Sequence, residues 1–351
     1  MTDLVPVTVL TGYLGAGKTT LLNRILTENH GKKYAVIVNE FGEVGIDNDL
    51  VVDADEEVFE MNNGCVCCTV RGDLIRILTG LMRRKGGFDA IIVETTGLAD
   101  PGPVAQTFFV DEEVRARTRL DSVTTVVDAK HVLLRLSDSR EAREQIAFAD
   151  QIVLNKTDLV SADDLRMVEA RLRRLNPLAP IHRAQRSNVP LDAILGRGSF
   201  DLDRIVTLEP DFLNPAHGEP GHVHDEHCEH DHGQDHDHGH GHDHAHHDHV
   251  HDDDIKGVAL TLQKPLDGAK ITRWLNDILQ TQGPDILRAK GIMDVAGDDR
   301  RLVFQAVHMI LEGDFQRPWK ADEARYSRLV FIGRNLDEAA LRAGFEACAA
   351  A

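Results

Sequence analysis

The sequence predicts an α/β fold, with a mainly parallel sheet in its first 200 residues and a small α+β domain at its C-terminal end. Three observations support this prediction. Short β-branched runs alternate with helix-like segments, a glycine-rich turn joins the first run to the first helix, and a tract of histidine and aspartate separates the two halves. Runs linked by crossover helices are typical of a parallel sheet that is covered on both faces.

The N-terminal part contains a regular series of strand-like runs. The first is VPVTVLT, and it is followed by KTTLLNRILTEN, in which apolar residues recur at helical spacing. A helix-like stretch separates most of the later runs. These runs lie at residues 34–40, 88–97, 122–129, 151–158 and 180–185. We therefore expect a first domain that ends near residue 200.

Residues 214–254 break this pattern. The segment has no apolar periodicity and cannot build a core, so we expect a disordered linker. It carries 15 of the 19 histidines, interleaved with aspartate and glycine. Such a composition suits several weak, exchanging sites for Zn²⁺, Ni²⁺ or Co²⁺, and a solvated acidic spacer is the alternative.

Regular elements resume after the linker. Strand-like runs are expected at 257–263, 285–296, 301–313 and 327–334, and helix-like segments at 267–282 and 335–350. This order, with one strand, a helix, three strands and a final helix, predicts a small α+β domain. The predicted segments of the chain are 1–204, 205–254 and 255–351.

The charge of the chain is concentrated in one place. The net charge is −19, and residues 205–255 hold 14 acidic residues and no Lys or Arg, which leaves −5 for the rest. No concentrated basic face is evident, so nucleic acid is not an expected partner. No apolar run approaches the roughly 18 residues of a membrane span, and no secretory signal is recognised. Together with thiols that have no evident disulfide partners, this predicts a cytoplasmic protein.

A phosphate-binding loop follows the first strand. GYLGAGKTT fits the pattern G-x-x-x-x-G-K-[ST] and lies between a predicted strand and a predicted helix. Glycines let consecutive N–H groups point at an anion, Lys18 supplies a cation to the terminal phosphates, and the Thr19 hydroxyl is placed to bind Mg²⁺. The residues expected to contact the nucleotide are Gly12, Tyr13, Leu14, Gly15, Ala16, Gly17, Lys18, Thr19 and Thr20.

The base is predicted from NKTD at residues 155–158, which follow another strand. Asp158 can accept hydrogen bonds from the ring N–H and the exocyclic amine of guanine, a pattern that adenine does not offer. Asn155 can bind the other edge of the base, and the stem of Lys156 can lie along the ring. GTP is therefore predicted rather than ATP, and the expected enzyme is a GTPase.

Two further segments are candidates to bind the metal ion and the γ-phosphate of the nucleotide. The run at 88–94 ends in ETTG, where Glu94 can hold Mg²⁺ and Gly97 can offer its N–H to the γ-phosphate; a cap for the next turn is the alternative. In NEFGEVGID, Glu40, Glu43 and Asp47 can meet Mg²⁺ or a second metal, with a solvated acidic loop as the alternative. The predicted catalytic residues are Lys18, Thr19 and Glu94. No water-positioning residue is assigned, so slow intrinsic hydrolysis is expected.

Three of the five cysteines, Cys65, Cys67 and Cys68, are crowded into NGCVCC. The adjacent pair is poorly placed to form a disulfide, and an odd total argues against a disulfide framework. Thiolates are soft ligands suited to Zn²⁺ and Cu(I). We therefore predict a metal site or a reactive thiol cluster, with buried packing residues as the alternative.

These motifs carry a resemblance to a known family. GYLGAGKTT, NEFGEVGID, NGCVCC, ETTGLADP and NKTD, in this order, resemble the CobW-type metallochaperone GTPases, and within them the zinc-regulated GTPase metalloprotein activators. The resemblance is dense over residues 5–160 and returns in LRAKGIMDV, LVFQAVHMILEGDF and RLVFIGRNLD. It implies a P-loop GTPase domain like those of CobW, HypB and UreG, a metal-binding linker, and a CobW-type C-terminal domain.

The resemblance also implies a function. A GTP-hydrolysing protein would bind Zn²⁺ through Cys65, Cys67 and Cys68, with Glu40 or Glu43 as a further candidate ligand, and would transfer the ion to a client apo-metalloenzyme. Two alternatives stay open. The cargo could be cobalt for cobalamin synthesis, nickel or iron, or the protein could be a metal buffer or sensor that nucleotide regulates. The sequence leaves the client and the oligomeric state open, with a homodimer as one alternative.

Overall fold

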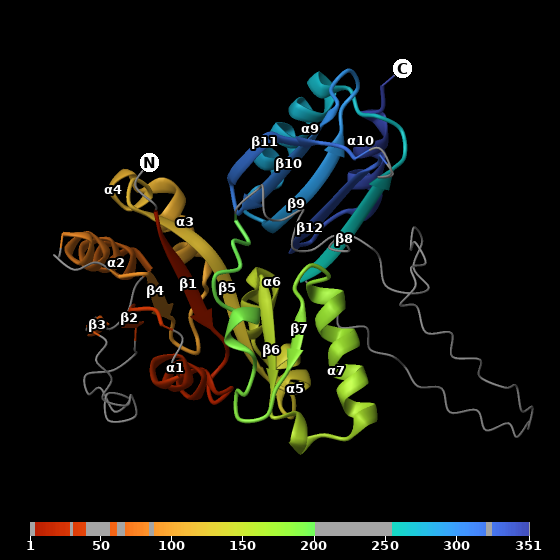
Figure 1. Cartoon of the computed structure of the whole chain (residues 1–351). Helices are drawn as coiled ribbons and strands as arrows, with labels where there is room; N and C mark the ends of the chain where they lie inside the picture. The colour runs from red at the N-terminus through yellow and green to blue at the C-terminus, as the bar shows by residue number, and fades with distance from the viewer. Residues whose placement is uncertain are drawn as a thin grey trace, which may run out of the picture.

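The computed structural model describes residues 4–28, 31–39, 57–61, 67–83, 88–200, 255–320 and 325–350. Two domains are visible in Figure 1, one built on a parallel sheet and one on an antiparallel sheet. The predicted boundaries near residues 204 and 254, and the predicted histidine-rich linker, lie outside the described residues and stay predictions. Among the helices described, none is long and apolar enough to cross a membrane.

A seven-stranded sheet forms the N-terminal domain, with the strand order β3-β2-β4-β1-β5-β6-β7. Every neighbouring pair is parallel, so the carboxyl ends of all strands lie along one edge of the sheet. The predicted parallel sheet is confirmed. The strands are β1 Val5–Thr11, β2 Tyr34–Asn39, β3 Glu57–Met61, β4 Ala90–Glu94, β5 Thr118–Asp128, β6 Gln151–Asn155 and β7 Ile181–Arg183.

Both faces of this sheet are covered, because successive strand residues point to opposite sides. Leu10 and Ile92 join the core beneath α1, whereas Val9 and Ile91 join the larger core beneath the helices of the other face. The helices are α1 Lys18–Thr27, α2 Cys67–Met82, α3 Gly102–Val110, α4 Glu112–Arg115, α5 Val132–Asp138, α6 Arg140–Phe148 and α7 Ala162–Leu175, with short 3₁₀ turns at Thr157–Leu159 and Leu191–Ala193.

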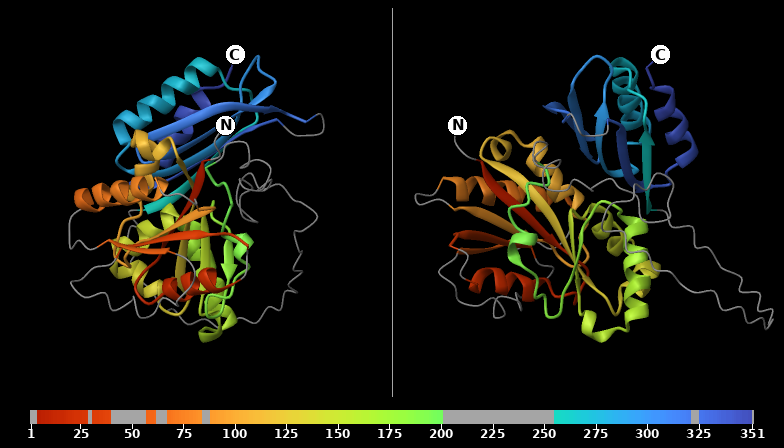
Figure 2. Two further views of the ribbon diagram at one scale, coloured as in Figure 1. Left: turned by 60° about the vertical axis from the view of Figure 1, so that its left-hand side comes forward. Right: turned by 45° about the vertical axis from the view of Figure 1, so that its right-hand side comes forward.

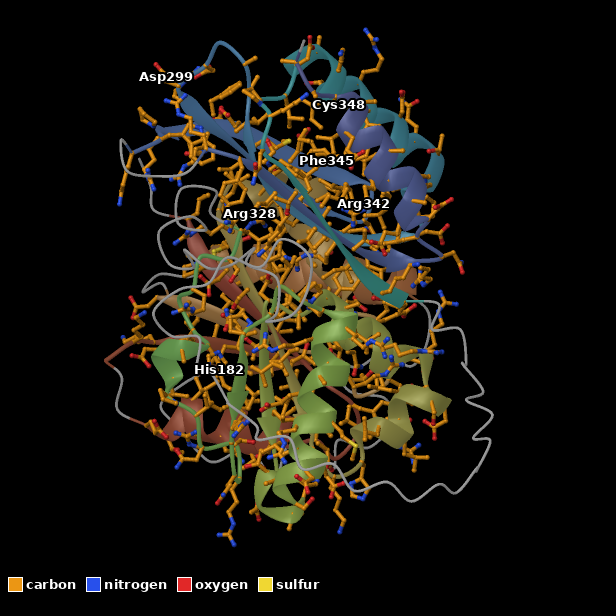
Figure 3. The ribbon with its side chains drawn as sticks, turned by 90° about the vertical axis from the view of Figure 1, so that its right-hand side faces the viewer. His182, Asp299, Arg328, Arg342, Phe345 and Cys348 are labelled. Carbon is orange, nitrogen blue, oxygen red and sulfur yellow. The ribbon has the colours of Figure 1, made fainter. Side chains whose placement is uncertain are left out.

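The C-terminal domain is a five-stranded antiparallel sheet with the order β11-β10-β9-β12-β8 and two helices on one face (Figure 2). Phe345 and Cys348 of the last helix lie in the apolar layer between these helices and the sheet (Figure 3). The elements are β8 Ile255–Leu262, α9 Gly268–Gln282, β9 Ile286–Asp294, β10 Arg300–Val307, β11 Ile310–Pro318, β12 Ser327–Arg334 and α10 Glu338–Ala347.

One sequence-based expectation for this domain is wrong. Residues 301–313 do not form a single strand; they divide into β10 and β11, so four strands rather than three follow α9. The chain turns at His308, whose φ of 52° lies in the left-handed region. Neither glycine nor proline marks this turn in the sequence, and histidine is one of the side chains that tolerate such a conformation.

The other face of the C-terminal sheet packs against α6 and α7 of the N-terminal domain (Figures 1 and 2). Leu287, Val307, Val330 and Ile332 belong to the same apolar core as residues of α6 and α7. The antiparallel sheet is therefore enclosed between α9 and α10 on one side and the N-terminal domain on the other. Apolar burial of this kind makes the two domains one packed unit.

A buried group of charges lies at this interface. The carboxylate of Asp150, between α6 and β6, accepts hydrogen bonds from Arg288 Nη2 at 2.6 Å and from Lys290 Nζ at 3.0 Å. It also accepts from the backbone N–H of Val123 at 2.9 Å. Burial works to raise the pKa of Asp150, but the charges of Arg288 and Lys290 outweigh burial and lower the pKa below its ordinary value.

A second ion pair joins the same two domains. Glu144 of α6 is buried and contacts Arg334 at the end of β12 and Arg140 on its own helix. The side chain of Phe148, one turn further along α6, faces the ring of His308 with ring centres 5.3 Å apart. The position of α6 is thus set by contacts with the C-terminal domain.

We expect Asp150→Ala to lower the free energy of unfolding by about 3–5 kcal/mol, because it leaves two buried cations uncompensated. Urea unfolding at neutral pH measures the change. The control is Glu169→Ala, which removes the surface pair with Arg183 and should cost at most about 1 kcal/mol. Equal losses in the two variants would contradict the role given to the buried cluster.

The lowered pKa of Asp150 also predicts that the free energy of unfolding depends on pH. Because the folded state lowers the pKa of Asp150 below the unfolded value of about 3.9, its stabilising contribution is complete above about pH 4. The contribution is lost as the pH falls through the lower, folded pKa. Asp150→Asn should lack this component, so the slope of unfolding free energy against pH below about pH 4 should be smaller in the variant.

Candidate nucleotide and metal site

The phosphate loop, residues 12–19, connects β1 to α1 in a path that requires glycine at two positions. Gly12 has a φ of 140°, and a Cβ there would lie 2.2 Å from the carbonyl oxygen of Val126 in β5. Gly17 has a φ of 110°, and a Cβ there would lie 2.5 Å from the side-chain nitrogen of Asn155. The loop can therefore approach the ends of β5 and β6 only because Gly12 and Gly17 have no side chains.

The N-terminus of α1 is left open for an anion. Helices α4, α6, α7, α9 and α10 each begin with an Asp or Ser side chain that accepts a hydrogen bond from the first turn. Helices α1, α3 and α5 begin without such a bond, and α1 follows Gly17, which has no side chain to make one. Its first N–H groups and its helix dipole are thus available to phosphate oxygens.

The predicted cation of the phosphate loop is in place. Lys18 is buried, and its Nζ donates a hydrogen bond to the carbonyl oxygen of Gly12 at 2.8 Å, so the side chain folds back across the loop. Thr19 is half-buried and Thr20 is exposed in the first turn of α1. The open helix end, Lys18 and the Thr19 hydroxyl form a donor set that fits a nucleotide phosphate.

Asn155, at the end of β6, forms hydrogen bonds with the phosphate loop and with Ser187, which follows β7. Its Nδ2 donates to the carbonyl oxygen of Ala16 at 2.9 Å and to Ser187 Oγ at 3.1 Å, while its Oδ1 accepts from the backbone N–H of Ser187 at 2.8 Å. The side chain is buried. The structure therefore shows a supporting role for Asn155, and its predicted contact with the base stays a prediction.

Lys156 follows with a left-handed backbone, φ 59°, which turns its side chain back toward the phosphate loop. Its Nζ donates to the carbonyl oxygen of Gly15 and to Asp128 Oδ2, both at 2.7 Å. This extends its stem beside the loop, as the predicted stacking on a base requires. Asp158 is exposed in the 3₁₀ turn after β6, with its carboxylate at the same sheet edge.

The sequence analysis missed Asp128, at the end of β5. Its Oδ2 accepts from Lys156 and contacts His131 Nδ1 at 2.9 Å. Burial works to raise the pKa of Asp128, but these hydrogen bonds outweigh it and lower the pKa below its ordinary value. The signal was present in VVDA, since a carboxylate at the carboxyl end of a neighbouring parallel strand must lie near NKTD.

The β7–η3 loop, residues 184–190, was also missed. Arg186 and Ser187 both have positive φ values, 49° and 56°, and the loop folds over Asn155. Arg24 of α1 holds its far side by donating to the carbonyl oxygens of Ser187 and Val189. The letters QRSN give no recognisable turn signal for two consecutive left-handed residues, so the sequence pattern could not have located this loop.

A cleft of about 380 Å³ adjoins the phosphate loop on the side of α5 and α6. Apolar residues of β5, α5 and α6 line it together with polar side chains. Arg135 stacks over the ring of Tyr13 there, 5.7 Å from the ring centre. The polar lining includes Tyr13, Asp128, His131, Arg135, Gln145 and Lys156.

Glu94 is the last residue of β4, and Gly97 follows it in the loop that leads to α3. Glu94 is buried at the strand end, beside Leu10 of β1. Thr95 continues this alignment, because its Oγ1 donates to Thr11 Oγ1 at 2.8 Å. A Cβ on Gly97 would lie 2.8 Å from the backbone nitrogen of Leu14, so the β4–α3 loop, residues 95–101, rests directly on the phosphate loop.

These groups also fit the magnesium ion that accompanies a nucleoside triphosphate. Thr19 offers a hydroxyl oxygen and Glu94 a carboxylate at the same edge of the sheet, and Mg²⁺ prefers such oxygen ligands. The ion would neutralise charge on the phosphates. The roles of Thr19 and Glu94 stay predictions.

The predicted metal-binding cysteines are only partly described. Cys67 and Cys68 form the start of α2, but the description does not extend to their side chains. Cys65, Glu40 and Glu43 lie outside the described residues. Within the part of the chain that is described, no three His, Cys, Asp or Glu side chains are grouped so that they could hold a metal ion.

Comparison with known families matches both domains. Residues 6–183 match the family described as "CobW/HypB/UreG, nucleotide-binding domain", and residues 255–349 match "Cobalamin synthesis protein cobW C-terminal domain". The chain belongs to the CobW family. The resemblance drawn from the five motifs is thereby confirmed, and the family is one of P-loop GTPases.

The chain is similar in sequence and in structure to several named proteins. The zinc chaperone YjiA of Escherichia coli is 35% identical over 346 residues, which span 97% of this chain and 98% of YjiA. Zinc-regulated GTPase metalloprotein activator 1 of Schizosaccharomyces pombe is 46% identical over 186 residues, or 51% of this chain and 45% of that protein. The crystal structure of the Zn(II)-bound YjiA GTPase from E. coli has a TM-score of 0.75 at 31% identity, covering 99% of this chain and 100% of that one.

We expect Gly17→Ala to weaken nucleotide binding by about tenfold or more, because its Cβ would displace Asn155 and strain a left-handed backbone. Titration with a fluorescent GDP derivative measures the affinity. Gly80→Ala is the matched control, since Gly80 lies in α2 with nothing within 4 Å of an added Cβ. Unchanged affinity in Gly17→Ala would show that the tight approach to Asn155 is not needed for binding.

Proposed function

We propose that this CobW-family protein is a GTP-hydrolysing zinc chaperone, which binds Zn²⁺ through Cys65, Cys67 and Cys68 and transfers it to a client apo-metalloenzyme. The observation that carries the proposal is the assembly of Gly17, Asn155 and Lys156 around an open helix end, in a chain similar over nearly its whole length to YjiA. YjiA is named a zinc chaperone, and its solved structure holds Zn(II).

The nucleotide half of the proposal follows from the residues around the phosphate loop. Lys18 and the first N–H groups of α1 bind the terminal phosphates, and Asp158 recognises guanine through its ring N–H and exocyclic amine. Gly97 offers its N–H to the γ-phosphate from the β4–α3 loop. Lys18 and Gly97 stabilise charge that develops on the γ-phosphate while water attacks it, which is the protein's part in hydrolysis.

The metal half is supported by the place of Cys67 and Cys68 at the start of a helix. Cys67 and Cys68 occupy the first turn of α2, where the positive end of the helix dipole favours thiolates over thiols. The thiolate is the form that binds Zn²⁺. A set of three cysteines leaves one position of a tetrahedral zinc ion open to a ligand of the client, which suits transfer better than storage.

The strand order explains how the two halves can communicate. In the sequence the cysteine segment follows β3, and β3 lies three strand positions from β1, or about 14 Å across the sheet. The loops after β2 and β4 leave the sheet between them, and both are candidates to sense the γ-phosphate.

We expect Asp158→Asn to weaken GTP binding by about tenfold or more, because an amide cannot accept from both guanine donors. The same variant should gain affinity for xanthosine triphosphate, whose base replaces the exocyclic amine with a carbonyl oxygen. Competition titration with the two nucleotides tests this. Asp163→Asn, an exposed residue of α7, is the control. If Asp158→Asn keeps the wild-type preference for GTP over xanthosine triphosphate, Asp158 does not recognise the guanine base.

We expect the affinity for Zn²⁺ to differ between the GTP-analogue and GDP states, with a matching change in nucleotide affinity when Zn²⁺ is bound. Competition with a chromophoric chelator measures the first and nucleotide titration the second. Cys67→Ala should weaken Zn²⁺ binding, whereas Cys348→Ala, which alters the buried thiol of the C-terminal domain, should not. Equal zinc affinities in both nucleotide states would contradict the coupling.

Transfer itself separates a chaperone from a buffer. The zinc-loaded protein is incubated with candidate apo-enzymes under GTP, GDP and a non-hydrolysable analogue, and recovery of client activity is followed. We expect recovery to depend on the nucleotide and to fail with Cys67→Ala. Loading the protein with Co²⁺ or Ni²⁺ tests other cargoes. Recovery of client activity that is the same under GTP, GDP and the analogue would support a metal buffer or sensor instead.

A further inference from the structure

Gln145 of α6 is a buried side chain that reaches across to the nucleotide-facing loops. Its Nε2 donates one hydrogen bond to the carbonyl oxygen of Gly97 at 3.0 Å and another to that of Ala99 at 3.1 Å. The side chain is 1% exposed. A primary amide nitrogen has two N–H donors, so both are used on the same short loop.

The loop is held from its other side by the phosphate loop. An added Cβ on Gly97 would lie 2.7 Å from Leu14 Cδ2 and 2.8 Å from the backbone nitrogen of Leu14. The β4–α3 loop thus contacts both Leu14 and the amide of Gln145. Fixing the carbonyl of Gly97 restricts its ψ rotation, and this rotation sets the direction of the Gly97 N–H relative to that carbonyl.

The residue that does this is itself firmly placed. The backbone carbonyl of Gln145 accepts from Thr125 Oγ1 of β5 at 2.8 Å. Its neighbours on α6, Glu144 and Phe148, contact Arg334 and His308 of the C-terminal domain. Because α6 is held by β5 and by the C-terminal sheet, Gln145 has a fixed position. Its two hydrogen bonds therefore determine where the β4–α3 loop lies.

We infer that Gln145 is a positioning residue for GTP hydrolysis, which orients the β4–α3 loop so that the N–H of Gly97 meets the γ-phosphate. The inference rests on the proposed function, because it assigns the γ-phosphate to Gly97. Gln145 acts through Gly97 and touches no reacting atom. Its contribution belongs to the triphosphate state, since GDP lacks the phosphate that this N–H would contact.

The test is Gln145→Met, which keeps the length and volume of the side chain and removes both donors. We expect the affinity for a non-hydrolysable GTP analogue and the kcat for GTP each to fall about tenfold, because two carbonyl groups lose their partners. The affinity for GDP should stay within about twofold. Fluorescent nucleotide titration and phosphate release measure these quantities.

The matched control is Gln305→Met. Gln305 of β10 is also buried, and its Nε2 donates to the backbone carbonyl of Phe200 at 2.9 Å, so the substitution removes the same kind of hydrogen bond. It does not touch the β4–α3 loop, and we expect the ratio of GTP-analogue to GDP affinity to stay as in the wild type. Thermal unfolding of both variants shows whether they are folded.

Several outcomes would overturn the inference: an unchanged affinity ratio in Gln145→Met, an equal loss of GDP affinity, or the same ratio change in Gln305→Met. If Gln145→Met does not fold, Gln145→Asn provides the test, since it keeps the amide but is too short by one methylene to reach both carbonyls. The affinity ratio needs no turnover. A wild-type protein that binds GTP but does not hydrolyse it would therefore contradict the proposed function, and the ratio would still decide on Gln145.

Discussion

The contact between the phosphate loop and the amide of Asn155 is the interaction on which the site depends. It closes only because Gly17 has no Cβ, and it joins the ends of β1, β6 and the β7–η3 loop through three hydrogen bonds. These segments are far apart in sequence. Their meeting holds the loop in place at the start of α1, which has no side-chain cap, as the proposed binding of phosphate at this helix end requires.

Much of this arrangement could be predicted from the sequence, for a physical reason. Parallel strands buried on both faces must be apolar throughout, so β1, β2, β4, β5 and β6 appear as compact runs. A parallel sheet then places every motif at a strand end on one edge. That rule was enough to bring the phosphate loop, ETTG and NKTD together, and it would have located Asp128 had it been applied to VVDA.

What the sequence could not predict depends on contacts between distant segments. The turn at His308 has no glycine or proline, and β3 is a short edge strand that includes two glutamates, unlike the apolar runs of the buried strands. The interface of the two domains is less visible still. Asp150, Arg288 and Lys290 look like ordinary surface charges in the sequence, and only the packing of β9 against α6 buries them together. Gln145 gives no signal either, because glutamine in a helix is usually unremarkable.

The buried charge cluster affects how the two domains would behave if they were separated. One carboxylate from the first domain neutralises two cations from the second, and the apolar face of β9 and β12 is covered by α6 and α7. A fragment cut near residue 200 would expose both that apolar face and the two positive groups in the C-terminal half, and it would expose Asp150, α6 and α7 in the N-terminal half. Each half would then be prone to self-association, so the protein is best produced and dissected by point substitution in the intact polypeptide rather than by truncation.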